Sequence, residues 1–145
     1  MVESLNVMQQ SWFVMEDRLD HVSKVKGARV LIVEDDKEYA DWIELALTGL
    51  GVSKIVKATD GNSALQLTQS EPNFDLIICD WLMPNMDGLD FLKRYREKVL
   101  TSMFLVLTTK GGLEDSFEIT QAGATNFLVK PLSIDELQSQ VSSML

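Results

Sequence analysis

Charged and hydroxyl side chains that could do chemistry stand at the ends of four apolar runs in this chain. Glu34 and Asp35 follow the run at residues 29–33, and Asp80 follows the run at residues 75–79. Thr108 is the last residue of the run at 104–108, and Lys130 is the last residue of the run at 126–130. Such runs are typical of parallel strands, and the ligand crevice of an open α/β sheet lies outside the carboxyl ends of its strands. The sequence therefore predicts that these side chains face one small site.

A site that gathers the carboxylates of Glu34, Asp35 and Asp80 must also hold positive charge. Two like charges roughly 4 Å apart repel by about 4 kcal/mol at an effective dielectric of about 20, and a third charge raises the penalty. Carboxylate oxygens with no histidine or thiol beside them favour Mg²⁺, for which Mn²⁺ can substitute. Lys130 would supply a second positive charge as a donor to a phosphoryl oxygen. We therefore predict that Asp80 is a nucleophile toward phosphorus and forms an aspartyl phosphate.

Each of these stretches also has a purely structural interpretation. The sequence "VEDD" (33–36), placed before a helix, could cap that helix and complement its dipole. Asp80 could cap the turn of "DWLMPNMDG", in which Asp87 and Gly88 supply common turn chemistry. Thr108 could be an ordinary β-branched strand residue, and Lys130 an ordinary strand end. The conjunction, with one feature on each of several strands in the right order, favours a site.

Short β-branched runs alternate with amphipathic segments from residue 29 onward. The predicted strands are residues 29–33, 54–58, 75–79, 104–108 and 126–130, and the predicted helices are residues 38–50, 62–69, 89–98, 113–122 and 133–144. The runs are too short for helices, and most are apolar on both faces, as strands of a doubly covered parallel sheet must be. Five repeats of strand and helix predict an α/β fold with right-handed crossovers.

Residues 1–27 depart from this rhythm and predict a separate amphipathic helix that ends before Gly27. Its apolar residues recur at spacings of three and four, as in a heptad repeat: Leu5, Met8, Trp12, Met15, Leu19 and Val22. This apolar stripe could pack on the domain formed by residues 28–145. Alternatively, it could pair with a second copy or continue an upstream coiled coil, and the sequence leaves these alternatives open.

The composition indicates a single domain of ordinary size with an acidic surface. The 145 residues are 46% hydrophobic, enough for a sizeable core, and the formal net charge is −9. This charge argues against direct binding of nucleic acid or of an anionic membrane, because both need a basic footprint. One cysteine excludes an intramolecular disulfide framework and suits a reducing compartment. Without a signal peptide or an apolar run of membrane-spanning length, the chain is expected in the cytoplasm.

Four segments resemble the receiver domain of bacterial two-component response regulators, of the chemotaxis-regulator type. The segments are "VLIVEDD" (30–36) for the first strand and acidic pair, "DLIICDWLMPNMDGLDFL" (75–92) for the phosphoacceptor strand and loop, "LVLTT" (105–109) for the switch threonine, and "AGATNFLVKP" (122–131) for the conserved-lysine strand. The resemblance covers about residues 28–145. It implies a flavodoxin-like, three-layer (βα)5 fold with a central parallel five-stranded sheet in the order 2-1-3-4-5, of which this family is a standard example.

Carried over by position, the resemblance implies a role for each site residue. Asp80 would accept a phosphoryl group from a sensor histidine kinase or a phosphotransfer protein, so the chain would be modified on Asp80 and would not be a turnover enzyme. Asp35 and Asp80 would ligate Mg²⁺ together with the backbone carbonyl of Leu82. Glu34 would act largely through metal-bound water, and Lys130 would pair with the phosphoryl group.

Phosphorylation would then shift the population between two packings of the domain. The added charge would draw the hydroxyl of Thr108 toward the phosphoryl group and free space for Phe127 to turn in behind it. The surface formed by helix 113–122, strand 126–130 and helix 133–144 would present a different face to a downstream protein partner. A homodimer could form through that face or through the amino-terminal helix.

Three positions depart from the pattern common in the family. Phe127 stands where many relatives have tyrosine, which keeps an aromatic switch but removes a hydroxyl hydrogen bond. Leu82, two residues after Asp80, is apolar where some relatives are polar, and Lys110, two residues after Thr108, adds a cation near the mouth of the site. Together, Leu82 and Lys110 could shield an acyl phosphate from water, which predicts slow self-dephosphorylation.

Other functions stay open from the sequence alone. A phosphatase of the haloacid-dehalogenase type commonly has a second aspartate two residues after its nucleophile, a position that Leu82 holds here. A receiver-like adaptor that is never phosphorylated would not need the intact set of site residues. The chain could also be a receiver segment of a larger hybrid kinase or regulator, with residues 1–27 as the tail of an upstream helix.

Overall fold

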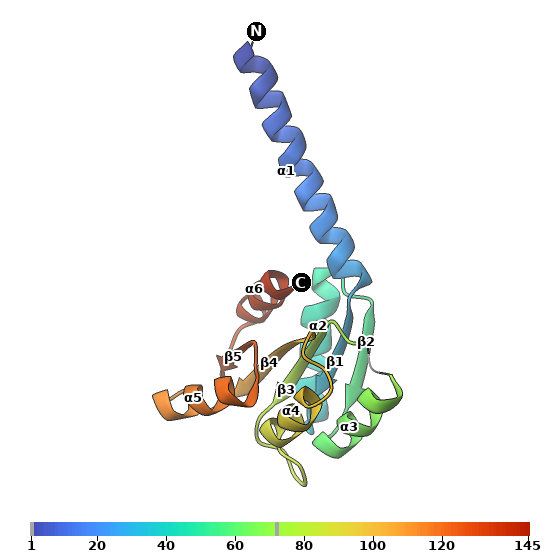
Figure 1. Cartoon of the computed structure of the whole chain (residues 1–145), viewed down its shortest axis with the longest axis vertical. Coiled ribbons are helices and arrows are strands. Elements are labelled where there is room, and N and C mark those ends of the chain that lie inside the picture. Colours follow the sequence, from blue (N-terminus) through green and yellow to red (C-terminus); the bar gives the residue numbers. More distant parts are fainter. Residues whose placement is uncertain (1, 72) are drawn as a thin grey trace.

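Strands and helices alternate after a long first helix in the computed structural model, which describes residues 2–71 and 73–145, with side chains of the first helix from Asn6 onward. The elements are α1 (Val2–Gly27), β1 (Arg29–Val33), α2 (Lys37–Leu50), β2 (Lys54–Ala58), α3 (Gly61–Ser70), β3 (Leu76–Asp80), α4 (Gly88–Arg96), β4 (Met103–Thr108), α5 (Leu113–Ala122), β5 (Asn126–Val129) and α6 (Ile134–Met144). The strands and the helices that follow them form the domain, and α1 extends away from it (Figure 1).

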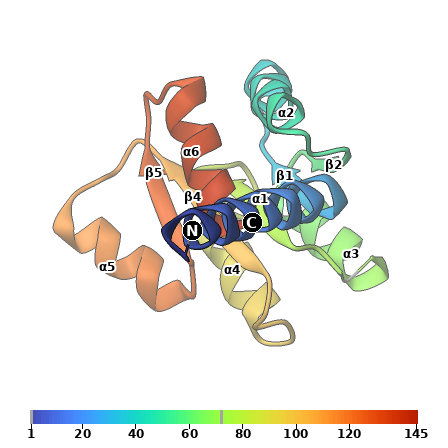
Figure 2. The ribbon, with the colours of Figure 1, turned by 90° about the horizontal axis from the view of Figure 1, so that it is seen from above.

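The five strands are parallel and lie in the order β2-β1-β3-β4-β5, which confirms the predicted fold class and strand order. Helices α3, α4 and α5 cover one face of the sheet, and α2 and α6 cover the other (Figure 2). Successive strand residues alternate between the two layers, since Ile77 lies in the core beneath α3 to α5 and Ile78 in the core beneath α2 and α6. Because both faces are covered, the strands can be apolar throughout, as their sequence indicated.

The strands that carry the predicted site residues end at the same edge of the sheet. Val33 at the end of β1 pairs with Cys79 of β3, and Thr108 at the end of β4 pairs with Val129 at the end of β5. Residues that follow these ends are therefore placed by the hydrogen-bond ladder of the sheet.

Several strand boundaries differ from the prediction by one residue. β3 runs to Asp80, one residue further than predicted, because the backbone N–H of Trp81 still donates to the carbonyl of Leu107 at 3.0 Å. β5 ends at Val129, so that Lys130 lies just beyond it. An apolar run marks buried side chains and does not mark the last hydrogen bond, so it cannot fix a strand end to one residue.

The apolar stripe of α1 is exposed over the described part of the helix. Five of its side chains are more than half exposed: Met8, Trp12, Met15, Leu19 and Val22. The predicted stripe also includes Leu5, whose side chain lies outside the described ones. The interpretation that the stripe packs on the domain is therefore wrong for these five residues. Although α1 is long, neither it nor any other helix within residues 2–71 and 73–145 is apolar enough to cross a membrane.

Gly88 allows the loop after β3 to return close to that strand. A Cβ atom at Gly88 would lie 2.1 Å from the carbonyl oxygen of Asp80 and 3.0 Å from the sulfur of Cys79. The backbone N–H of Gly88 donates to the carbonyl of Trp81 at 2.7 Å. Only a residue without a side chain fits this approach, so Gly88 fixes the loop beside the strand end that carries Asp80.

Gly88→Ala is expected to lower the free energy of unfolding by about 2–3 kcal/mol, because the new methyl group would overlap a backbone oxygen that cannot move without breaking the strand end. Gly27→Ala is the matched control, since nothing lies within 4 Å of a Cβ at that helical position. The control should be neutral or slightly stabilising. Urea unfolding measures both variants, and equal stability of Gly88→Ala and the wild type would contradict the close approach.

Candidate functional site

Three carboxylates meet at the strand ends, as the sequence predicted. Glu34 and Asp35 follow β1, and Asp80 ends β3, and each offers an oxygen that lies within 4.8 Å of those of the other two. Glu34 is 3% exposed, Asp80 is half-buried and Asp35 faces solvent. The group therefore spans from the protein interior to its surface, with the most buried charge on Glu34.

The helices next to the site are capped by residues other than Glu34, Asp35 and Asp80. The side chain of Asp36 caps α2 by accepting from the backbone N–H groups of Glu38 and Tyr39. The side chain of Asp87 caps α4 by accepting from the N–H of Asp90 at 2.9 Å. The structural interpretation thus accounts for Asp36 and Asp87 and leaves Glu34, Asp35 and Asp80 without a capping role.

Lys130 brings the positive charge into this group. Its Nζ lies 3.2 Å from Oδ1 of Asp80 and 3.7 Å from Oε2 of Glu34, and its side chain is 18% exposed. The backbone N–H of Lys130 donates to the carbonyl of Thr108 at 2.7 Å, which continues the ladder between β4 and β5. The ammonium group is therefore held over the carboxylates by the end of the sheet.

The site holds three carboxylates and one lysine, so it lacks positive charge. Burial, and then the nearby charge of Asp80, raise the pKa of Glu34 to about 7. Burial also raises the pKa of Asp80, and Lys130 opposes that change only in part. Oε2 of Glu34 is buried and has no hydrogen-bond partner among the described residues, because Lys130 lies beyond hydrogen-bond distance.

A divalent cation fits this donor set. The cluster consists of carboxylate oxygens, which suit Mg²⁺ and Mn²⁺, and neither histidine nor cysteine belongs to it. The unpartnered Glu34 oxygen and the raised pKa values show that the residues present would gain from added positive charge. Asp35 and Asp80 could hold the ion directly, with Glu34 behind them.

Thr108 ends β4 beside Lys130, and Lys110 follows it two residues later. Thr108 is buried, and its hydroxyl oxygen accepts the backbone N–H of Lys110 at 2.9 Å. The ammonium of Lys110 lies 5.2 Å from the centre of the ring of Trp81, the residue that follows Asp80. Lys110 is thus held over the loop that follows β3 by a cation–π contact.

Leu82 and Phe127 occupy different environments from the charged group. Leu82 lies in the loop after β3 with 51% of its surface exposed. Phe127 is half-buried on β5, where it pairs with Val106 and packs against the core beneath α4 and α5. Phe127 thus lies on β5, beside β4, and two residues before Val129, the residue that pairs with Thr108.

Tyr39 is a site residue that the sequence did not mark. The Nζ atom of Lys130 lies 4.1 Å from the centre of the Tyr39 ring, which in turn packs against Trp42. Burial and the charges of Glu34 and Asp80 raise the pKa of Tyr39 to about 12, so its hydroxyl stays protonated. Its position in the first turn of α2, four residues after Asp35, was the one available signal.

Comparison with known proteins gives consistent matches to one family. A family model described as the response regulator receiver domain matches residues 30–142. The transcriptional regulatory protein QseB of Escherichia coli O157:H7 is 32% identical over 117 residues, 81% of this chain and 52% of that protein. The probable chemotaxis protein CheY of Rhizobium etli is 33% identical over 125 residues, 85% of this chain and 96% of that protein. The chain therefore spans about half the length of QseB and nearly all of that CheY.

Solved structures match a similar share of the chain. The receiver domain of the Francisella response regulator 1452 has a TM-score of 0.75 at 33% identity, covering 81% of this chain and 96% of that chain.

Removing the charge of Glu34 is expected to stabilise the metal-free protein near neutral pH. The pKa of Glu34 is about 7 in the folded chain against an ordinary value of 4.5. Between these values the folded protein keeps a proton that the unfolded chain releases, so the free energy of unfolding falls as pH rises through this window and levels off above it. Glu34→Gln should flatten this fall and add about 2 kcal/mol at a pH of about 8. Urea unfolding in EDTA across this window tests it, and an unchanged pH slope in the variant would contradict it.

Proposed function

Because the chain belongs to the response regulator receiver domain family, we propose that Asp80 accepts a phosphoryl group in a two-component phosphorelay. Receiver domains are phosphoacceptors and not typical turnover enzymes, and those of response regulators interact with histidine kinases or phosphotransfer proteins. The observation that supports Asp80 is its carboxylate at the end of β3, 3.2 Å from Lys130 and beside Glu34 and Asp35. In this proposal residues 28–145 form the receiver and residues 1–27 form a helical extension.

The transfer step uses a carboxylate oxygen of Asp80 as the nucleophile. This oxygen would attack the phosphorus of a phosphohistidine on the kinase or phosphotransfer protein. The P–N bond breaks as the P–O bond forms, and the imidazole leaves with the electron pair of the broken bond. Lys130, which now pairs with Asp80, would donate to a phosphoryl oxygen of the product. Tyr39 would keep the Lys130 ammonium in place through its ring.

Asp35, Asp80 and the backbone carbonyl of Leu82 would hold Mg²⁺, or Mn²⁺ in its place, with Glu34 acting through bound water. When bound, the ion supplies the positive charge that balances the carboxylates and the phosphoryl oxygens. The buried oxygen of Glu34, which has no hydrogen-bond partner within the described part of the chain, supports a need for this charge.

The switch step would use Thr108 and Phe127. The hydroxyl oxygen of Thr108 accepts from the N–H of Lys110, so its own proton is available to a phosphoryl oxygen. Movement of Thr108 toward the phosphoryl group would open space behind it for the ring of Phe127. The face made by α5, β5 and α6 would then change and select a downstream protein partner.

Incubation with acetyl phosphate and Mg²⁺ should add one phosphoryl group to the chain, as read by intact mass. Asp80→Asn should abolish the adduct, because an amide cannot form the acyl phosphate. Asp90→Asn, which changes an exposed aspartate on α4, is the matched control and should still be modified. An adduct that persists in Asp80→Asn would contradict the assignment. Absence of any adduct in the wild type would instead favour a phosphorylation-independent adaptor.

The lifetime of the phosphoryl group should depend on Leu82 and Lys110. The exposed Leu82 and the Lys110 side chain fixed on Trp81 flank the strand ends that carry Asp80 and Thr108, so they are placed to hinder attack by water. Leu82→Asn combined with Lys110→Glu should shorten the phosphoryl half-life several-fold.

The control for that experiment is Lys54→Glu, which makes the same charge change at an exposed position on β2. Decay of the mass adduct measures all three proteins. A half-life that is unchanged in the double variant would remove the shielding hypothesis.

A further inference from the structure

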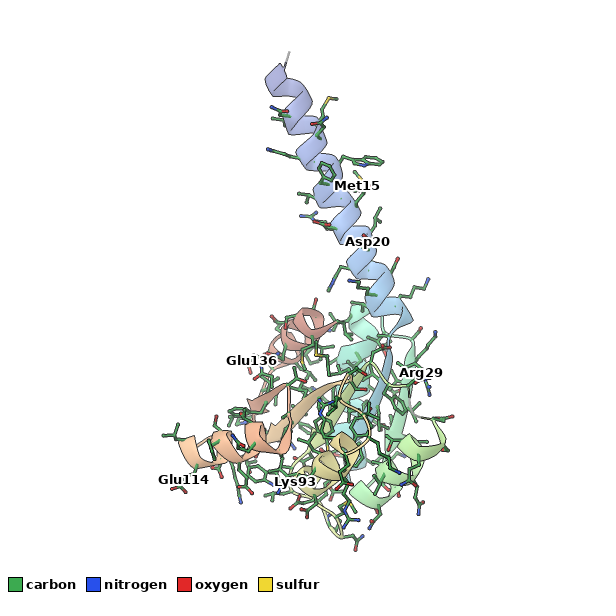
Figure 3. The ribbon with its side chains drawn as sticks, in the orientation of Figure 1. Met15, Asp20, Arg29, Lys93, Glu114 and Glu136 are labelled. Atoms are coloured by element: carbon green, nitrogen blue, oxygen red, sulfur yellow. The ribbon has the colours of Figure 1, made fainter. Side chains whose placement is uncertain are left out.

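Helix α1 carries an apolar stripe, most of which stands clear of the domain (Figure 1). The described stripe residues Met8, Trp12, Met15, Leu19 and Val22 are each between half and 70% exposed. Figure 3 shows Met15 and Asp20 on the part of α1 that stands clear of the domain. None of the five stripe residues is charged, so they form one continuous apolar surface along the helix. Val7, Phe13 and Val14 are also more than half exposed but lie off this stripe.

The lower end of α1 is fixed to the domain. Val25 is buried in the core beneath α2 and α6, and the side chain of His21 is hydrogen-bonded to the hydroxyl of Ser142 on α6 at 3.0 Å. The hydroxyl of Ser53 donates to the carbonyl of Lys26 at 3.2 Å. These contacts begin at His21, beside the last stripe residue Val22, so the domain holds the base of the helix but leaves the stripe side chains exposed.

An uncovered helix of this composition needs a packing partner. Most of the stability of a protein helix comes from burying its apolar face, and contacts confined to residues 21–26 leave the rest of α1 without that support. The helix is 26 residues long, about 39 Å at 1.5 Å per residue. A pair of such helices with five large apolar side chains from each copy reaches the order of 1,000 Å² expected of a specific interface.

The charge pattern of α1 favours another protein helix over a membrane. Three acidic residues (Glu16, Asp17 and Asp20) balance three basic ones (Arg18, Lys24 and Lys26) along the described helix. A helix that lies on an anionic membrane would carry an excess of basic residues on its polar face. The balanced helix has no such excess, and it does not repel a copy of itself.

The stripe is complementary to itself when two copies run in opposite directions. With the pair centred between Trp12 and Met15, Trp12 faces the partner's Met15, and Met8 faces the partner's Leu19. Each tryptophan then packs against a flexible thioether, which is a favourable contact, whereas parallel pairing would stack the two tryptophans in one layer. The antiparallel arrangement also keeps the two acidic receiver domains at opposite ends of the helix pair.

We infer that α1 pairs with α1 of a second copy of this chain through the stripe, as a two-stranded antiparallel coiled coil. The interface lies outside the phosphoacceptor site and does not depend on the proposed function. It also leaves the face of α5, β5 and α6 free for another partner.

Sedimentation of the full chain tests the interface. The wild type should be a dimer at concentrations of about 10 to 100 µM. Met15→Glu, which places a charge in the centre of the stripe, should weaken dimerisation at least about 100-fold. Gln10→Glu adds the same charge on the opposite face of α1 and should leave the dimer intact. A monomeric wild type, or a dimer that survives Met15→Glu, would overturn the inference.

Cysteine cross-linking tests the direction of the two helices. Cys79, the one cysteine of the chain, is fully buried, so an engineered thiol on α1 is the accessible one. Under mild oxidation, a mixture of Met8→Cys and Leu19→Cys chains should form the mixed disulfide, because these positions share a layer. Val22→Cys alone should not form a disulfide dimer. Efficient cross-linking of Val22→Cys would require parallel helices and would overturn the antiparallel arrangement.

Discussion

The structure of the site depends on the crowding of three carboxylates around one lysine at the edge of a parallel sheet. The buried oxygen of Glu34 has no hydrogen-bond partner among the described residues, and burial raises the pKa values of both Glu34 and Asp80. A site built only for stability would remove such charges or pair them fully. Here the shortage of positive charge is retained, which is what a site needs if it is to attract a cation and hold a nucleophilic carboxylate beside it.

The fold keeps this arrangement in place by using backbone interactions and neighbouring caps. The hydrogen-bond ladder holds the ends of β1, β3, β4 and β5 at one edge, and Asp36 and Asp87 satisfy the helix ends on either side. Gly88 allows the loop to lie against the end of β3. The charged groups are therefore left free for ligands, since no helix terminus needs them. The same sheet connects the site to Phe127 and to the face of α5, β5 and α6, where a change could be sensed by a partner.

Sequence patterns predicted the sheet and the cluster because both follow from simple rules. Apolar strands alternate with amphipathic helices, and the ends of parallel strands share an edge. These two rules alone predict that Glu34, Asp35, Asp80 and Lys130 lie together. The sequence did not mark Tyr39 as a site residue, because an aromatic residue in the first turn of a helix is as typical of the core as of a site. The predicted ends of β3 and β5 differ from the observed ends by one residue, because hydrophobicity does not mark the last hydrogen bond between two strands. The spacing of the α1 stripe predicted an amphipathic helix, but spacing carries no information on which surface covers it.

The central claim, that Asp80 is the phosphoacceptor, is tested most directly by chemical mapping of the modified residue. The chain would be phosphorylated by a histidine kinase or by a small phosphodonor in the presence of Mg²⁺ and then treated with borohydride, which reduces an acyl phosphate to an alcohol. Peptide mass spectrometry would locate the reduced side chain. Reduction is expected at position 80 alone. Reduction at Glu34 or Asp35, or a stable phosphoryl group on His21, would contradict it.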